Sequence, residues 1–183
     1  ISNINESKNA LKSKIEGALT RLKQATLIQQ NGEEYSFLTN EEQDVTRGIK
    51  NTQIDSSDVL NEVYRNIYEE IYTKKSITPY PQGQSYYFVR KVDDVVRGSQ
   101  AEDIEVKFIT SMNSDYKFSE SELKMKFLAG NTLFIKLNEN GYLQELETIL
   151  KTDKYIKQKS SVKQSEMQDM ILKNRGAELI ERK

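Results

Sequence analysis

The sequence Ile104-Glu-Val-Lys-Phe-Ile109 decides what kind of fold this chain can adopt. Apolar residues at 104, 106 and 108 alternate with Glu105 and Lys107, which is the pattern of a β-strand with one buried and one solvated face. One further strand is predicted before it, at Tyr86–Val92, and one after it, at Leu133–Leu137. The second half of the chain is therefore predicted to form a small mixed α/β unit with three to four strands and a C-terminal helix.

Helical periodicity replaces this alternation in the first half of the chain. Apolar residues at 11, 15, 19 and 22 predict a helix over about Ala10–Ala25. The pair Asn31-Gly32 follows, and it is a strong hairpin signal because a type I′ turn needs positive φ at both central residues. Thr39 and Glu42 then have the spacing of a capping box, which starts another helix. A helix, a hairpin and further helices resemble a winged-helix unit, so the predicted fold class is α+β with a winged-helix-like first half.

Both prolines of the chain, Pro79 and Pro81, lie just before Gly83 and break the helical pattern. We predict a helical subdomain over 10–78, a small α+β subdomain over 84–160, and a helical tail over 161–183. The stretch Leu123–Phe127 is ambiguous, because its alternation favours a strand while Ser119 and Glu122 favour a capped helix.

The composition excludes several kinds of site. The 183 residues contain neither histidine nor cysteine, so a zinc site, a cysteine nucleophile and a histidine base are all excluded. The formal net charge is -1, which gives no global attraction to nucleic acid or membrane. No apolar run is long enough to span a bilayer, and no signal segment occurs. We expect a cytoplasmic protein without membrane contact, cut from something longer.

One pattern resembles a catalytic site. Many metal-dependent nucleases place an aspartate near a strand end and Glu-x-Lys on the next strand, where the acids bind Mg²⁺ and the lysine lies near the scissile phosphate. Asp93-Asp94, Glu105 and Lys107 have this order. The same residues are also typical of any amphipathic strand with a charged outer face. The alternative function is thus a nuclease that uses Asp94, Glu105 and Lys107.

A DNA-binding winged helix is a further alternative, but the charges of the hairpin disfavour it. Glu33 and Glu34 lie in the hairpin, and Glu41, Glu42 and Asp44 follow it, so phosphate would be repelled there. Residues 151–183 contain nine basic and five acidic residues, a net charge of +4. This excess fits either phosphate contact or a solvated helix face. The possible phosphate contacts are Lys12, Lys14, Arg21 and Lys23 in the first helix, and Lys154, Lys157 and Lys159 in the tail.

No Gly-rich phosphate loop of either common kind occurs, so we expect no nucleotide site and no cofactor in this chain. Several stretches nevertheless resemble the large P-loop ATPases of the BREX phage-defence system (BrxC/PglY type), over roughly Ala10 to Ser160. These stretches are Ala18–Leu22, Asn31–Asp44, Ile49–Asn51, Tyr87-Phe88, Val92–Asp94, Glu105–Thr110 and Leu150–Ile156.

The resemblance implies that the chain lies downstream of the nucleotide-binding core of a very long bacterial ATPase. ATP and Mg²⁺ are then implied only for the parent chain. The implied partners are the rest of that ATPase and other defence proteins, with DNA as a weak partner. The implied function is a non-catalytic accessory module that couples the ATPase to these partners. Gly48 departs from the charged residue expected there, and no catalytic residue carries over.

Overall fold

The computed structural model describes residues 7–78, 83–97, 104–161 and 165–182. The chain forms two compact units and passes between them twice, once in the loop at residues 53 and 54 and once within the long helix that contains residues 147 and 148. Unit 1 comprises 1–53 and 148–183, and unit 2 comprises 54–147. No helix in the described ranges is long and apolar enough to cross a membrane.

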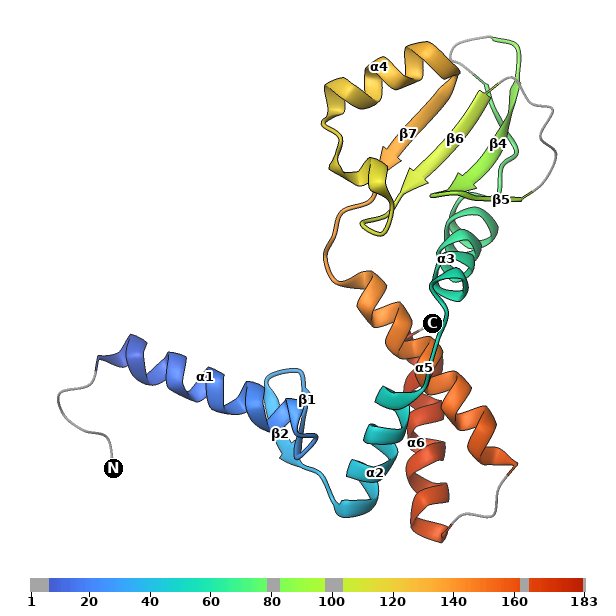
Figure 1. The fold of residues 1–183 in the computed structure, drawn as a ribbon. Coiled ribbons are helices and arrows are strands. Elements are labelled where there is room, and N and C mark those ends of the chain that lie inside the picture. The colour runs from blue at the N-terminus through green and yellow to red at the C-terminus, as the bar shows by residue number, and fades with distance from the viewer. Residues whose placement is uncertain (1–6, 79–82, 98–103, 162–164, 183) are drawn as a thin grey trace. The chain divides into compact units, whose positions relative to one another are not determined.

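Unit 1 consists of helices and one β-hairpin (Figure 1). The predicted hairpin forms, with Ile28 opposite Phe37, but its turn is shifted by one residue from Asn31-Gly32, because Asn31 pairs with Glu34 and leaves Gly32 and Glu33 as the turn residues. Gly32 has a φ of 61°, the left-handed conformation that glycine adopts without strain. The Thr39–Glu42 capping box is also confirmed. The elements of this unit are α1 (Lys8–Gln24), β1 (Ile28–Asn31), β2 (Glu34–Phe37), α2 (Asn40–Asn51), the larger part of α5 (Tyr142–Ser160) and α6 (Glu166–Arg182).

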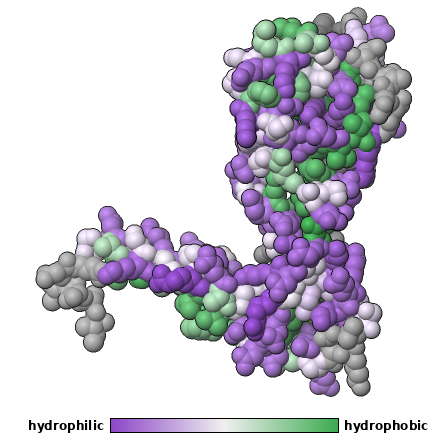
Figure 2. Space-filling model, in the orientation of Figure 1, coloured by the Kyte–Doolittle hydropathy of each residue, from purple (hydrophilic) through white to green (hydrophobic). Residues whose placement is uncertain are grey.

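The apolar centre of unit 1 lies where α2 meets α6. Val45 and Ile49 of α2 pack against Ile171 and Leu172 of α6, and Tyr155 of α5 covers this cluster. In contrast, α1 buries none of its residues. Figure 2 shows hydrophobic surface at the β1–β2 hairpin, where Phe37 is exposed.

Unit 2 is a sheet with helices on both sides (Figure 1). Its three longest strands are parallel in the order β4-β6-β7, while β3 and β5 pair antiparallel with β4. The two added strands are only two and three residues long, too short for a periodic signal. The elements are α3 (Ser56–Arg65), the π-helix η1 (Asn66–Ile71), β3 (Ser76–Ile77), β4 (Tyr86–Val92), β5 (Val95–Arg97), β6 (Ile104–Ile109), the 3₁₀-helix η2 (Ser114–Lys117), α4 (Glu120–Gly130) and β7 (Thr132–Lys136).

Tyr68 connects the helical segment before the prolines to this sheet. Its hydroxyl donates to the carbonyl oxygen of Val106 at 2.6 Å, and its ring meets Phe108 edge-on at 5.5 Å. Residues 54–78 therefore pack with the sheet. The compact units do not follow the predicted division at the prolines, because a buried tyrosine joins the segments on both sides of them.

The π-helix changes which helix face is buried. The sequence predicts an apolar face of Val59, Leu60, Val63, Ile67 and Ile71, and a second stripe of Tyr64, Tyr68 and Tyr72 in core or helix contacts. Val59, Val63, Tyr64 and Tyr68 are buried as predicted, but Ile71 is exposed. The amide of Tyr72 donates to the carbonyl of Ile67, which is the wider spacing of a π-helix. The extra residue in this turn shifts the helical phase, so that Ile71 leaves the buried face.

Candidate functional site

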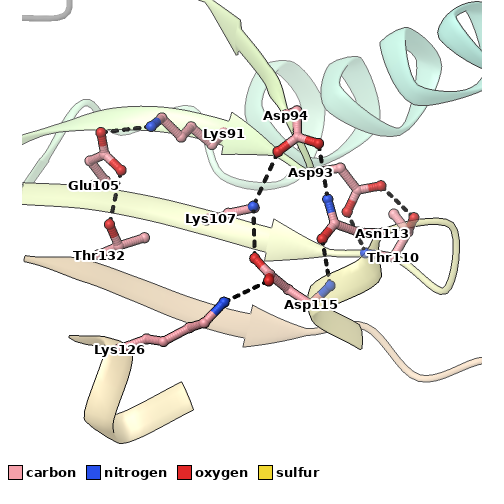
Figure 3. A network of polar contacts seen from close by, with 10 residues as sticks. All are labelled: Lys91, Asp93, Asp94, Glu105, Lys107, Thr110, Asn113, Asp115, Lys126 and Thr132. Atoms are coloured by element: carbon pink, nitrogen blue, oxygen red, sulfur yellow. Dashed lines mark hydrogen bonds and ion pairs between the residues drawn. The ribbon is translucent and has the colours of Figure 1, made fainter. Parts of the chain in front are cut away.

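The candidate site lies on one face of the sheet, where charged residues from β4, β6 and β7 come together (Figure 3). Lys91 of β4 lies beside Lys107 of β6, and Glu105 of β6 lies beside Thr132 of β7. Side chains in register on neighbouring strands project from the same face. This register brings charged residues of β4 and β6 onto one surface.

The two-residue turn after β4 contains both aspartates of the predicted pattern, and their side chains contact different residues. Val92 pairs with Val95, so Asp93 and Asp94 form the turn, and Asp93 has a φ of 50°. The carboxylate of Asp93 is buried and accepts hydrogen bonds from the amide and the hydroxyl of Thr110, at 2.8 and 2.6 Å. Burial raises the pKa of Asp93, although the Thr110 hydrogen bonds oppose the rise. Asp93 therefore joins the turn to the end of β6 and faces away from solvent.

Lys107 occupies the centre of the network. Its Nζ lies 3.3 Å from the Asp94 carboxylate and 3.1 Å from the Asp115 carboxylate, and only 11% of its side chain is exposed. Asp115 also accepts from Lys126 of α4 at 2.7 Å. The hydrogen bond from Lys126 is the largest of the effects that lower the pKa of Asp115. Lys107 thus bridges two carboxylates, Asp94 in the turn after β4 and Asp115 in η2.

Glu105 belongs to a separate part of the network. Its carboxylate accepts from Lys91 at 2.7 Å and from the Thr132 hydroxyl at 2.9 Å. The Lys91 hydrogen bond is the main reason that the pKa of Glu105 is lowered. Figure 3 shows the two groups side by side on the strands without a contact drawn between Glu105 and either aspartate of the turn.

The residues of the predicted nuclease pattern are therefore only partly brought together. Lys107 contacts Asp94, but Glu105 pairs with Lys91 instead of sharing a ligand position with Asp94. Among the described residues, no group of three or more acidic side chains could hold a metal ion. The charges of Lys91, Lys107, Glu105, Asp94 and Asp115 on this face are paired with one another.

The sequence interpretation missed the residues that complete this network. Asp115 and Lys126 come from η2 and α4, and Asn113 donates from its side chain to Asp94. One signal was available for η2, because the sequence Asn113-Ser-Asp115 permits an asparagine cap, and Asn113 does accept from the Asp115 amide. No sequence pattern predicts that Lys126 contacts Asp115, because the contact depends on how α4 lies against the sheet.

Tyr142 is a buried polar group close to this network. Its hydroxyl has no hydrogen-bond partner among the described residues. Burial, reinforced by the negative charge of Asp93, raises the pKa of Tyr142 to about 12. The tyrosine therefore stays protonated at neutral pH, as a neutral neighbour of the buried carboxyl group.

The predicted phosphate contacts lie in unit 1, and several already have partners. Lys154 donates to the carbonyl of Gln53 at 2.9 Å, and Lys157 pairs with Asp153 at 2.6 Å. The Lys159 ammonium group lies 5.6 Å from the centre of the Tyr155 ring. In α1, Lys23 donates to Gln30 at 2.9 Å and Lys12 lies 3.8 Å from Glu16. Surface contacts of this kind are weak, so the lysines keep most of their capacity to bind an anion.

A comparison with known protein families identifies the family of the chain. Residues 52–183 match the family described as the BREX ATP-binding protein BrxC 4th domain with six-stranded beta sheet. In the described part of that range, the sheet has five strands. No solved structure matches the chain. Because the match covers well over half of its length, the chain belongs to the BrxC family of BREX ATP-binding proteins.

Proposed function

We propose that this chain is a non-catalytic interaction module of a BrxC-type ATPase, and that it couples the ATP-binding part to partner proteins or DNA in phage defence. The observation that carries the proposal is the pairing of Lys107 with Asp94 and Asp115 while Glu105 binds Lys91. A catalytic metal needs carboxylate oxygens that converge on one point and remain open to solvent. Here the carboxylates of Asp94, Asp115 and Glu105 pair with Lys107 and Lys91 and do not converge on one point, which supports a structural role for the charged face.

The sequence adds a second reason. It contains no Gly-rich phosphate loop, and ATP and Mg²⁺ are therefore proposed to bind to other parts of the BrxC-type protein. Calorimetry of the chain with ATP and Mg²⁺ should show no heat of binding. Micromolar affinity for ATP would contradict this part of the proposal.

The complete protein provides the direct test of coupling. We expect a variant of the complete BrxC-type protein that lacks residues 52–183 to bind ATP like the unmodified protein, because the proposed module lies outside the nucleotide site. The same variant should no longer co-purify with other proteins of the BREX system. If co-purification and phage exclusion both survive the deletion, the proposed coupling role is wrong.

A further inference from the structure

The sheet of unit 2 has an open edge at β7. This strand pairs only with β6 among the described residues, whereas β4 carries β3 and β5 besides β6. An open strand edge presents unpaired N–H and C=O groups, which form a template for another strand. β7 is therefore one edge of the sheet where a further strand can add, and it is longer than β3 and β5, the short strands at the other edge.

The hydrogen bonds between β6 and β7 show which N–H and C=O groups of β7 remain free to pair with another strand. The Leu137 amide donates to the Ile109 carbonyl, and the Asn131 carbonyl accepts from the Glu105 amide. In a parallel ladder, alternate residues direct both backbone groups to the same neighbour. The odd-numbered residues of β7 thus face β6, so Thr132, Phe134 and Lys136 direct their N–H and C=O groups to the open edge.

A groove of about 640 Å³ lies along this edge, between β7 and α4. Specific ligand pockets typically have volumes of roughly 300–1,000 Å³. Leu123 and Phe127 form the helical side of the groove, and Leu133 and Phe134 form the strand side. Leu133 is 40% exposed and Phe127 is 41% exposed, so the apolar surface is available to a partner. Figure 1 shows α4 beside β7 at this end of the sheet.

The charges of the groove indicate what kind of segment fits. Lys124 on the helix and Lys136 on the strand line it. Lys136 lies over the Tyr116 ring at 4.4 Å, which leaves its charge unneutralised. Glu120 is the one acidic residue of the lining, so the groove has a net positive charge.

We infer that the β7 edge and the α4 groove bind an extended segment of a partner protein, which adds to the sheet as a strand. The segment alternates apolar residues, which enter the groove, with acidic residues, which pair with Lys124 and Lys136. Backbone hydrogen bonds to Thr132, Phe134 and Lys136 provide affinity, and the groove provides specificity. This inference rests on the interaction role proposed above and specifies the surface that carries it.

The experiment uses a random heptapeptide library displayed on phage, selected against the purified chain. We expect the selected peptides to share an apolar–acidic alternation. Addition of a selected synthetic peptide should slow hydrogen–deuterium exchange at the amides of Phe134 and Lys136. A library without enriched peptides, or peptides that protect other amides and leave β7 unchanged, would overturn the inference.

Two variants test the mechanism of binding. Phe134→Pro removes an outward N–H and no bond to β6, so a folded protein should result that binds the peptide at least about tenfold more weakly. Phe134→Leu keeps the N–H and is the matched control. If Phe134→Pro fails to fold, Lys124→Glu with Lys136→Glu replaces it and should also weaken binding at least about tenfold. Unchanged affinity in the folded variants contradicts the inference.

A failure of the inferred β7 surface can be distinguished from a failure of the proposed coupling role. A complete protein that carries Phe134→Pro and still co-purifies with its partners, while the deletion of 52–183 does not, would reject the β7 edge and leave the interaction module intact.

Discussion

Lys107 holds the polar face of the sheet together at the level of single residues. It is almost buried, and it lies between two carboxylates that come from different loops. Removing a partner from such a network leaves another charge without compensation in a partly buried place. The network should therefore contribute measurably to the stability of unit 2.

The first prediction concerns Lys107→Met, which keeps the length of the side chain and removes its charge. We expect the free energy of unfolding to fall by about 1–2 kcal/mol, because the partly buried Asp115 carboxylate loses one of its two lysine partners, whereas the ion pair to the exposed Asp94 contributes little. Urea unfolding measures the change. Lys124→Met is the matched control, and we expect a change within about 0.5 kcal/mol at this surface site. Equal effects of the two substitutions would show that Lys107 has no structural role.

The second prediction concerns how the free energy of unfolding depends on pH. The pKa values of Asp115 and Glu105 are lowered in the folded protein, so their contribution to stability is present above the unfolded pKa values and is lost as pH falls. We expect the unfolding free energy to decrease as pH falls from about 5 to about 3. Asp93 acts in the opposite direction, since its pKa is raised and its protonation favours the folded state.

Substitution of single acids separates these contributions. Asp115→Asn should make the loss of stability between about pH 5 and about pH 3 shallower, and Asp93→Asn should make it steeper. Urea midpoints at several pH values provide the measurement. An identical pH profile in Asp115→Asn and the unmodified chain would mean that Asp115 does not contribute through its ionised form.

At the level of elements, Gly48 explains how α2 and α5 approach each other. A Cβ atom at position 48 would lie 2.6 Å from Cζ of Tyr155, far inside van der Waals contact. The missing side chain lets the Tyr155 ring lie against α2 and cover the Val45–Ile49 cluster. The sequence alone showed only that Gly48 departs from the expected charged residue, and the structure gives the departure a steric reason.

The third prediction is that Gly48→Ala destabilises the chain by about 1–3 kcal/mol, since the Tyr155 ring must move. Gly17→Ala is the control in a second helix. Its Cβ would meet only Arg21, at 3.7 Å, so helix propensity should stabilise that variant by about 0.5–1 kcal/mol. Adding Tyr155→Leu to Gly48→Ala should recover part of the loss. Thermal unfolding that ranks both glycine variants alike would refute the steric explanation.

The elements were largely predictable because local patterns determine them. The strands at 86–92 and 104–109 have the predicted bounds, and the two capping boxes begin α2 and α4. The ambiguous stretch Leu123–Phe127 is helical, so local capping prevails there over alternation. The exposure of Ile71 was not predictable, because a π-turn shifts the helical phase there. The pairing of Glu105 with Lys91 depends on strand order, which no local pattern contains.

For the whole molecule, the distribution of charged residues determines where DNA could bind and how tightly. The basic residues lie on α1 and α5, and the hairpin region carries Glu34, Glu41 and Glu42, which repel phosphate. Scattered lysines give non-specific affinity, with Kd on the order of 10⁻⁴–10⁻⁶ M at physiological salt. Any binding should fall steeply as the salt concentration rises.

The fourth prediction tests where DNA would bind. Charge reversal of Lys154, Lys157 and Lys159 to Glu should abolish any gel shift, provided that circular dichroism shows a folded protein. Replacing Glu33 and Glu34 with Gln should leave the shift unchanged or strengthen it slightly. Sequence-specific, nanomolar binding that depends on the hairpin would instead make the first half of the chain a DNA reader.

We propose that the charged face of the sheet is structural and not catalytic. The most direct measurement incubates supercoiled plasmid with the purified chain and Mn²⁺, and compares the unmodified chain with Glu105→Ala. Because Glu105 pairs with Lys91 and Lys107 is bridged by Asp94 and Asp115, we predict no nicking by either protein. Mn²⁺-dependent nicking by the unmodified chain that a folded Glu105→Ala variant loses would contradict the claim.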